Sequence, residues 1–169
     1  YNQLITNMAS AERIFEILDT KPDIEDKINS VELPPIKGEV EFRNVTFGYN
    51  ENQIVLKDVS FTVKPGETIA LVGPTGVGKT TIVNLISRFY DAQKGSVLID
   101  GHDVKDVTIE SLREQMGIMT QDTFLFSGSI KDNIRYGRLD ATDEEIIEAA
   151  KAVRAHEFIM KLPKGYDTN

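Results

Sequence analysis

The sequence predicts an α/β fold with an antiparallel β region near its start. A glycine-rich loop, 73–80, lies between two apolar segments. The segment before it, 68–72, is short and β-branched, which is typical of a buried strand. The segment after it, 81–88, carries apolar residues at helical spacing. β-patterned segments come first and strand–helix units follow, and this order indicates an α/β domain.

The loop fits the pattern G-x-x-x-x-G-K-[ST], the phosphate-binding loop (P-loop) of nucleoside triphosphatases. Its glycines let the backbone curl so that successive N–H groups face an anion. The helix that follows adds the positive end of its dipole. We expect Lys79 to reach the β- and γ-phosphates and the Thr80 hydroxyl to ligate Mg²⁺. Because the full pattern lies between a strand and a helix, we prefer a nucleotide site to a glycine turn with a solvated lysine.

Composition narrows the classes of function. The chain has 169 residues, of which 40% are hydrophobic and 27% charged, as in an ordinary soluble domain. Its net charge of −8 gives no electrostatic support for a nucleic-acid partner. The absence of cysteine excludes disulfides and thiolate metal sites. No apolar run is long enough for a membrane span, no signal peptide is recognisable, and a chain that opens on Tyr1 is expected to be part of a longer one.

β-patterned segments flank the loop on both sides. Residues 40–45 and 55–63 are expected to form strands, with a turn at 48–52 between them. A short strand at 96–99 ends in the tight turn Asp100-Gly101. An aspartate after an apolar strand is also compatible with a Mg²⁺ ligand, but the Asp-Gly pair favours the turn.

The remaining elements are mostly helical. We expect a helix over 4–18, either packed on its own domain or arriving from another, and a polar, proline-punctuated linker over 19–35. A short helix near Leu112 leads to a strand at 117–120. One or two helical turns follow at 129–134, and the capping-box sequence 142–145 starts a further helix with a solvated acidic face.

Six further stretches, taken in order, carry a family resemblance. They are 42–49, 55–61, 65–67, 95–101, 117–122 and 125–134. With the P-loop they resemble the N-terminal portion of the nucleotide-binding domain of an exporter-type ATP-binding cassette (ABC) transporter, and the resemblance covers essentially the whole chain. It implies a P-loop NTPase core with an antiparallel β annex. It assigns 1–20 to the tail of the helix leading from the membrane domain, 21–37 to a linker and 38–169 to the ATPase domain.

The resemblance also implies the cofactors ATP and Mg²⁺. Tyr49 falls on the family's adenine-stacking aromatic, although alone it would be taken for a turn aromatic. Gln121 falls on the Q-loop glutamine, which ligates Mg²⁺ or orients a water. Lys79 and Gln121 are then the expected catalytic residues, and Thr80 and Gln121 the metal ligands. The expected nucleotide contacts are Tyr49, Gly73, Pro74, Thr75, Gly76, Val77, Gly78, Lys79, Thr80 and Thr81.

At the level of function, the resemblance implies an ATP hydrolase that drives transmembrane transport of an unknown substrate. Its expected partners are a transmembrane domain of the same transporter and a second nucleotide-binding domain, identical or not, at the cytoplasmic face of the membrane, with no nucleic acid. The chain ends before the family's signature segment, Walker B strand and switch histidine, and neither His102 nor His156 matches that histidine. The 169 residues alone are therefore expected to bind nucleotide at best.

Three alternatives stay open. A soluble cassette ATPase of DNA maintenance or translation would show long coiled-coil insertions or basic patches, and the sequence has neither. A P-loop kinase or GTPase would lack the segment around Tyr49. A module that senses nucleotide without turnover is compatible with these 169 residues.

Overall fold

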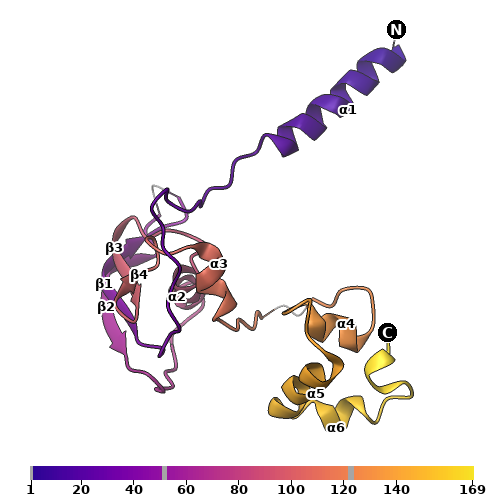
Figure 1. Cartoon of the computed structure of the whole chain (residues 1–169). Coiled ribbons are helices and arrows are strands. Elements are labelled where there is room, and N and C mark those ends of the chain that lie inside the picture. Colours follow the sequence, from indigo (N-terminus) through magenta and orange to yellow (C-terminus); the bar gives the residue numbers. More distant parts are fainter. Residues whose placement is uncertain (1, 51–52, 122–123) are drawn as a thin grey trace. The chain divides into compact units, whose positions relative to one another are not determined.

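The structure, a computed structural model, describes residues 2–50, 53–121 and 124–169 (Figure 1). Between residues 2 and 10, only the side chain of Met8 is described. The chain divides into two compact units, Tyr1–Gly117 and Ile118–Asn169. The end of the expected turn at 48–52 and Asp122 of the expected Q-loop lie outside the described residues.

The first unit contains a four-stranded antiparallel sheet in the order β2-β1-β3-β4. Its strands are β1 (Val40–Phe47), β2 (Leu56–Val63), β3 (Lys94–Ile99) and β4 (His102–Asp103). The register of β1 shifts between Phe42 and Val45, where Asn44 has a φ of 48°. This bulge changes the alternation of side chains, so that Phe42, Val45 and Phe47 are all buried. The sheet confirms the expected antiparallel region.

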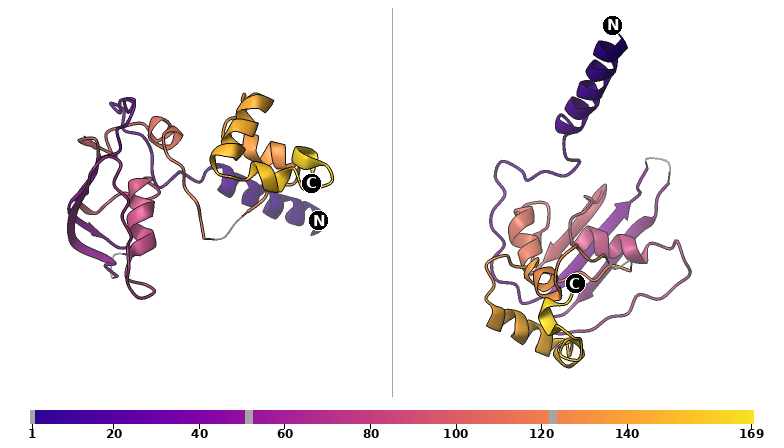
Figure 2. Two further views of the ribbon diagram at one scale, coloured as in Figure 1. Left: turned by 90° about the horizontal axis from the view of Figure 1, so that it is seen from below. Right: turned by 90° about the vertical axis from the view of Figure 1, so that its right-hand side faces the viewer.

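Two helices cover one face of this sheet, α2 (Lys79–Ile86) and α3 (Ile109–Glu114) (Figure 2). Leu85 of α2 and Leu112 of α3 are 1% and 0% exposed, and both belong to the main hydrophobic core. The buried strand residues of that core are Phe42, Val45, Phe47, Leu56, Val97 and Ile99. Packing against the sheet therefore fixes the direction of α2, the helix that begins at the glycine loop.

Two expected strands, 68–72 and 117–120, are not formed, and these predictions were wrong. Both segments have irregular backbone. Val72 is 87% exposed and Met119 97% exposed. A strand exists only where a neighbour accepts its hydrogen bonds, and no strand among the described residues pairs with either segment. Apolar, β-branched composition alone therefore does not make a strand here.

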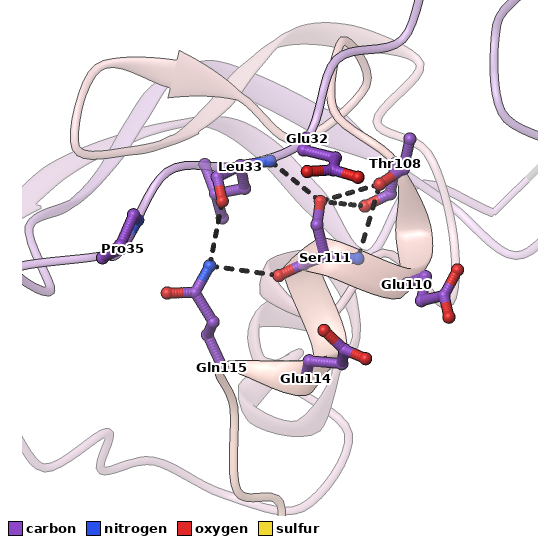
Figure 3. Close-up of a pocket in the computed structure, with 8 residues that line it drawn as sticks. All are labelled: Glu32, Leu33, Pro35, Thr108, Glu110, Ser111, Glu114 and Gln115. Atoms are coloured by element: carbon purple, nitrogen blue, oxygen red, sulfur yellow. Dashed lines mark hydrogen bonds between the residues drawn. The ribbon is translucent and has the colours of Figure 1, made fainter.

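Residues 25–36 run along the far end of α2 and along α3. Arg88, which follows α2, is 1% exposed, and its guanidinium donates to Val107 O at 2.9 Å, Glu25 O at 3.0 Å and Asp26 Oδ1 at 3.2 Å. Further along, Leu33 N donates to Ser111 Oγ, and Gln115 Nε2 donates to Leu33 O (Figure 3).

Residues 25–36, which make these contacts, fall largely in the expected linker. Although irregular, the segment is hydrogen-bonded to Arg88 and to α3 within the first unit. Beside it lies a polar hollow of about 380 Å³, lined by Glu32, Leu33, Pro35, Thr108, Glu110, Ser111, Glu114 and Gln115. The hollow shares no residue with the glycine loop, so it is separate from the predicted site.

The chain begins with helix α1 (Asn2–Leu18), as its periodicity predicts. Its described large apolar side chains are exposed: Met8, Ile14, Phe15, Ile17 and Leu18. Among the helices in the described part of the chain, none has the length and apolar character needed to cross a membrane.

The second unit is helical. It contains α4 (Ile130–Arg135), α5 (Asp143–Ala152), α6 (His156–Ile159) and a 3₁₀ turn at Gly165–Asp167. The capping box expected at 142–145 is present: Thr142 Oγ1 accepts from Glu145 N, and Glu145 accepts from Thr142 N. Ser129 and Asp132 make the same arrangement at the start of α4. The buried apolar residues of the second unit are Ile146 and Ala150 of α5 and Ile159 of α6.

Candidate nucleotide-binding site

The glycine loop curls in the first unit and leads directly into α2. Gly76 and Gly78 have φ values of 88° and 96°, in the region that side chains with a Cβ disfavour. At Gly78 a Cβ would also lie 2.7 Å from Leu56 Cδ2 of β2. Gly78 is the N-cap of α2, and no side chain caps its N–H groups. The curl therefore ends at an uncapped helix N-terminus.

The loop presents hydrogen-bond donors without partners from the protein. Within the described part of the chain, no backbone N–H of residues 75–80 donates to a protein acceptor. Lys79 Nζ bends back and donates to Gly73 O at 2.8 Å and Pro74 O at 2.9 Å. Consecutive N–H groups, a helix N-terminus and an ammonium group together suit a polyanion. The phosphates of a nucleotide fit this donor set, because they supply many acceptor oxygens and negative charge.

The two threonines after Lys79 differ in burial. Thr80 is exposed, so its hydroxyl is accessible as a ligand for a cation bound to the phosphates. Thr81 is 3% exposed, and its Oγ1 lies 3.1 Å from the Tyr49 hydroxyl. The residues that sequence reasoning assigned to phosphate and base therefore lie together in one unit, joined through α2.

Tyr49 follows β1 and is 46% exposed. Its ring centroid lies 5.0 Å from that of Phe47 and 5.0 Å from that of Tyr90, at interplanar angles of 85° and 87°. Asn84 Nδ2 donates to the Tyr49 hydroxyl at 3.3 Å. Sequence reasoning missed Asn84 and Tyr90; the available signal was that Asn84 is a polar residue one helical turn after Thr81, among the apolar residues of the second half of α2.

Gln121 lies in the second unit, in irregular backbone, and is exposed. Its predicted role as a catalytic residue and Mg²⁺ ligand remains a prediction. No cluster of three or more His, Cys, Asp or Glu side chains that could hold a metal occurs among the described residues. A metal at this site would depend on the Thr80 hydroxyl and on oxygens of the phosphates.

Asp100 belongs to a turn, as its Asp-Gly sequence favours. It lies between β3 and β4 with a φ of 47°. Its carboxylate accepts from the N–H groups of Lys37, Gly38 and Glu39. Each histidine has a local partner: His102 Nδ1 lies 3.2 Å from Asp100 O, and His156 Nδ1 lies 2.9 Å from the Tyr166 hydroxyl.

Known proteins resemble this chain over most or all of its length. The family model described as "ABC transporter" matches residues 56–167. The uncharacterized ABC transporter ATP-binding protein YfiC of Bacillus subtilis is 54% identical over 99% of this chain and 28% of its own length. An ATP-dependent lipid A-core flippase of Syntrophus aciditrophicus is 50% identical over 99% of the chain and 28% of its own length.

Among solved structures, a bacterial Atm1-family ABC exporter with ATP bound is similar, with a TM-score of 0.87 and 41% identity. The match covers 99% of this chain and 30% of that chain. This chain thus spans less than a third of the length of the relatives that it matches. The family match shows the P-loop NTPase fold. The chain therefore belongs to the ABC transporter family.

Proposed function

We propose that this chain binds Mg²⁺-ATP as part of the ATPase domain of an ABC exporter. The observation that carries the proposal is the loop at 73–80. Its N–H groups at 75–80 have no protein acceptor in the described part of the chain, and Lys79 lies across the loop on two of its carbonyls. An incoming triphosphate offers both sets of donors a stronger, charged acceptor.

Each residue has a distinct proposed part. The N–H groups of the loop hold phosphate oxygens, and Lys79 exchanges its two carbonyl partners for β- and γ-phosphate oxygens. The Thr80 hydroxyl would be a ligand of Mg²⁺, which would supply positive charge beside the phosphates. The family resemblance alone adds the Gln121 side-chain oxygen as a second ligand. The exposed ring of Tyr49 stacks on the base, a contact that contributes about 1–3 kcal/mol. The alternative role that the resemblance implies for Gln121 is to orient a water for hydrolysis in the whole protein.

For the whole protein we propose ATP-driven export across a membrane. Two such domains, in the same or different chains, would bind ATP between them at the cytoplasmic face, each attached to a transmembrane domain. The support comes from relatives: one is named an ATP-dependent flippase and another an exporter with ATP bound. These relatives are more than three times longer than this chain, which leaves room for the proposed membrane domain.

We further propose that the 169 residues by themselves bind nucleotide without appreciable hydrolysis. Phosphoryl transfer requires a positioned water and stabilised charge on both sides of the γ-phosphate. The loop supplies the phosphate contacts and one expected Mg²⁺ ligand. A turnover above background that disappears in Lys79→Ala would contradict this part of the proposal.

Calorimetric titration with ATP, with and without Mg²⁺, tests the binding. Lys79→Ala is expected to weaken ATP binding roughly 10- to 100-fold, because a charged hydrogen bond contributes about 1.5–3 kcal/mol. Lys64→Ala is a matched control, since Lys64 is an exposed lysine after β2 and outside the loop. Folded protein that binds neither ATP nor ADP would refute the proposal, as would equal losses in Lys79→Ala and Lys64→Ala.

A further inference from the structure

The Tyr49 side chain is fastened to the helix that starts at the phosphate-binding loop. Its hydroxyl lies 3.1 Å from Thr81 Oγ1 and accepts a hydrogen bond from Asn84 Nδ2 at 3.3 Å. Thr81 and Asn84 are three residues apart on α2, so they lie on one face of the helix. Between the Tyr49 and Thr81 hydroxyls either oxygen can be the donor. The three side chains thus form a hydrogen-bonded chain from Asn84 through Tyr49 to Thr81.

The ring itself is held by two aromatic neighbours. Phe47 and Tyr90 each lie 5.0 Å from the Tyr49 centroid in near-perpendicular, edge-to-face arrangements. Such pairs contribute about 0.5–1.5 kcal/mol beyond area burial and orient the ring. Tyr49 nevertheless remains an exposed residue. A ring with only two rotatable bonds, fixed at its hydroxyl and by its neighbours, has little freedom left to lose when a ligand stacks on it.

We propose that Asn84 is a positioning residue for the nucleotide base. It fixes the Tyr49 ring to α2, so that the base platform and the phosphate loop move as one body. This inference rests on the proposed function, because it assumes that the base stacks on Tyr49. Asn84 itself lies on α2 and acts through the Tyr49 hydroxyl, with Thr81 completing the connection. Losing the connection lets the ring rotate, and stacking must then order it again.

The test compares two ligands that share the phosphates but differ in the base. Mg²⁺-ATP and Mg²⁺-tripolyphosphate are titrated calorimetrically into the whole protein. Four variants are compared: Asn84→Ala, which removes the donor; Tyr49→Phe, which keeps the ring without its hydroxyl; Tyr49→Leu, which removes the ring; and Val83→Ala. Val83 is an exposed neighbour of Asn84 on α2, so its variant controls for changes in the helix.

We expect Asn84→Ala and Tyr49→Phe each to weaken ATP binding about three- to tenfold, the range of one net hydrogen bond. Tyr49→Leu should weaken it more. Without the hydroxyl Asn84 has no partner there, so the double variant Tyr49→Phe/Asn84→Ala should match Tyr49→Phe alone. Tripolyphosphate should bind all variants within twofold of the wild type, which also shows that the loop is folded. Val83→Ala should change neither affinity.

Two results would overturn the inference while leaving the proposed function in place. In the first, Asn84→Ala binds ATP within twofold of the wild type although Tyr49→Leu does not. In the second, Asn84→Ala weakens tripolyphosphate as much as ATP, and Asn84 then supports the helix instead of the ring. A wild-type protein that binds neither ligand would overturn the proposed function together with the inference.

Discussion

Two short stretches of the first unit gather consecutive backbone N–H groups, and they differ in what accepts them. At residues 37–39 all three N–H groups donate to the carboxylate of Asp100. At residues 75–80, in the described part of the chain, none donates to a protein acceptor. Both curls suit an anion. The anion at the first curl is the Asp100 side chain of the protein itself, whereas the second curl needs an anionic ligand.

The curl at 37–39 is therefore expected to contribute to the stability of the sheet, and the curl at 75–80 to the affinity for a ligand. The curl at 37–39 leads into β1 and ties it to the turn that follows β3, so its anion stabilises the sheet. The curl at 75–80 is exposed except at Gly78 and Lys79, and it leads into α2. A change to its donors should therefore alter affinity for an anion and leave the fold nearly unchanged.

The largest expected effect comes from giving the open curl an anion of its own. In Thr75→Asp a carboxylate competes for the loop N–H groups and repels a triphosphate. At about 4 Å and an effective dielectric of about 20, one charge pair contributes roughly 4 kcal/mol. After screening by salt we expect ATP affinity to fall about 100-fold in a calorimetric titration.

Thr75→Asn is the matched control, since asparagine has nearly the same shape as aspartate but carries no charge. It should bind ATP within about threefold of the wild type. Equal losses in the two variants would mean that the shape of residue 75, and not competition by an internal anion, controls binding.

Removing the anion of the filled curl should instead destabilise the sheet. Asp100→Ala leaves three N–H groups without their acceptor, and we expect the free energy of opening of the β1 and β3 amides to fall by about 2 kcal/mol in native-state hydrogen exchange. Asp23→Ala removes an exposed carboxylate from the same unit and should change it by less than about 0.5 kcal/mol. Unchanged protection in Asp100→Ala would show that the curl forms without its anion.

Sequence reasoning succeeded where the information is local. The glycine pattern at 73–80, the Asp100-Gly101 turn and the capping box at Thr142 each depend on residues within one turn of chain, and each has the expected local structure. The composition of 68–72 predicted a strand equally well, but a strand depends on a partner elsewhere. Local pattern therefore predicted the loop and the turns correctly but not all of the sheet pairing.

The same limit applies to the candidate site. The spacing of the loop predicted Lys79 and the glycines, whereas the contacts of Tyr49 with Thr81 and Asn84 join residues 32 and 35 positions apart. Likewise, nothing near Asp100 in the sequence indicates that its carboxylate binds residues 37–39. Such contacts arise from the packing of β1, β3 and α2, so they could be found only in the structure.

A pH titration should separate the two curls further. Partial burial raises the pKa of Asp100, but the N–H groups of Glu39, Lys37 and Gly38, helped by the Lys37 charge, lower it more, so the pKa lies below the ordinary value of 3.8. A lowered pKa means that the ionised carboxylate favours the folded state. Its contribution is complete above the ordinary pKa and is lost as the pH falls through the lowered one.

The measurement is the difference in opening free energy between the wild type and Asp100→Asn. We expect this difference to be constant from about pH 7 to pH 5, and to shrink as the pH falls below about 4. A difference that grows toward low pH would have the wrong sign for a carboxylate stabilised by N–H donors.

The smallest expected effects come from one glycine in each curl. Gly38 and Gly76 have φ values of 99° and 88°, and a Cβ at either would meet nothing within 4 Å. Alanine therefore introduces only backbone strain, about 1 kcal/mol at each position.

Asp100 holds the curl at Gly38 in place, so Gly38→Ala should lower the opening free energy of the sheet by that amount and leave ATP affinity unchanged. The loop at Gly76 has no such anchor and relaxes, so Gly76→Ala should leave the sheet nearly unchanged and weaken ATP binding about fivefold, because the relaxed N–H groups no longer converge. If Gly76→Ala destabilised the sheet as much as Gly38→Ala and kept full ATP affinity, the open curl would be as rigidly held as the filled one, and the contrast between them would be lost.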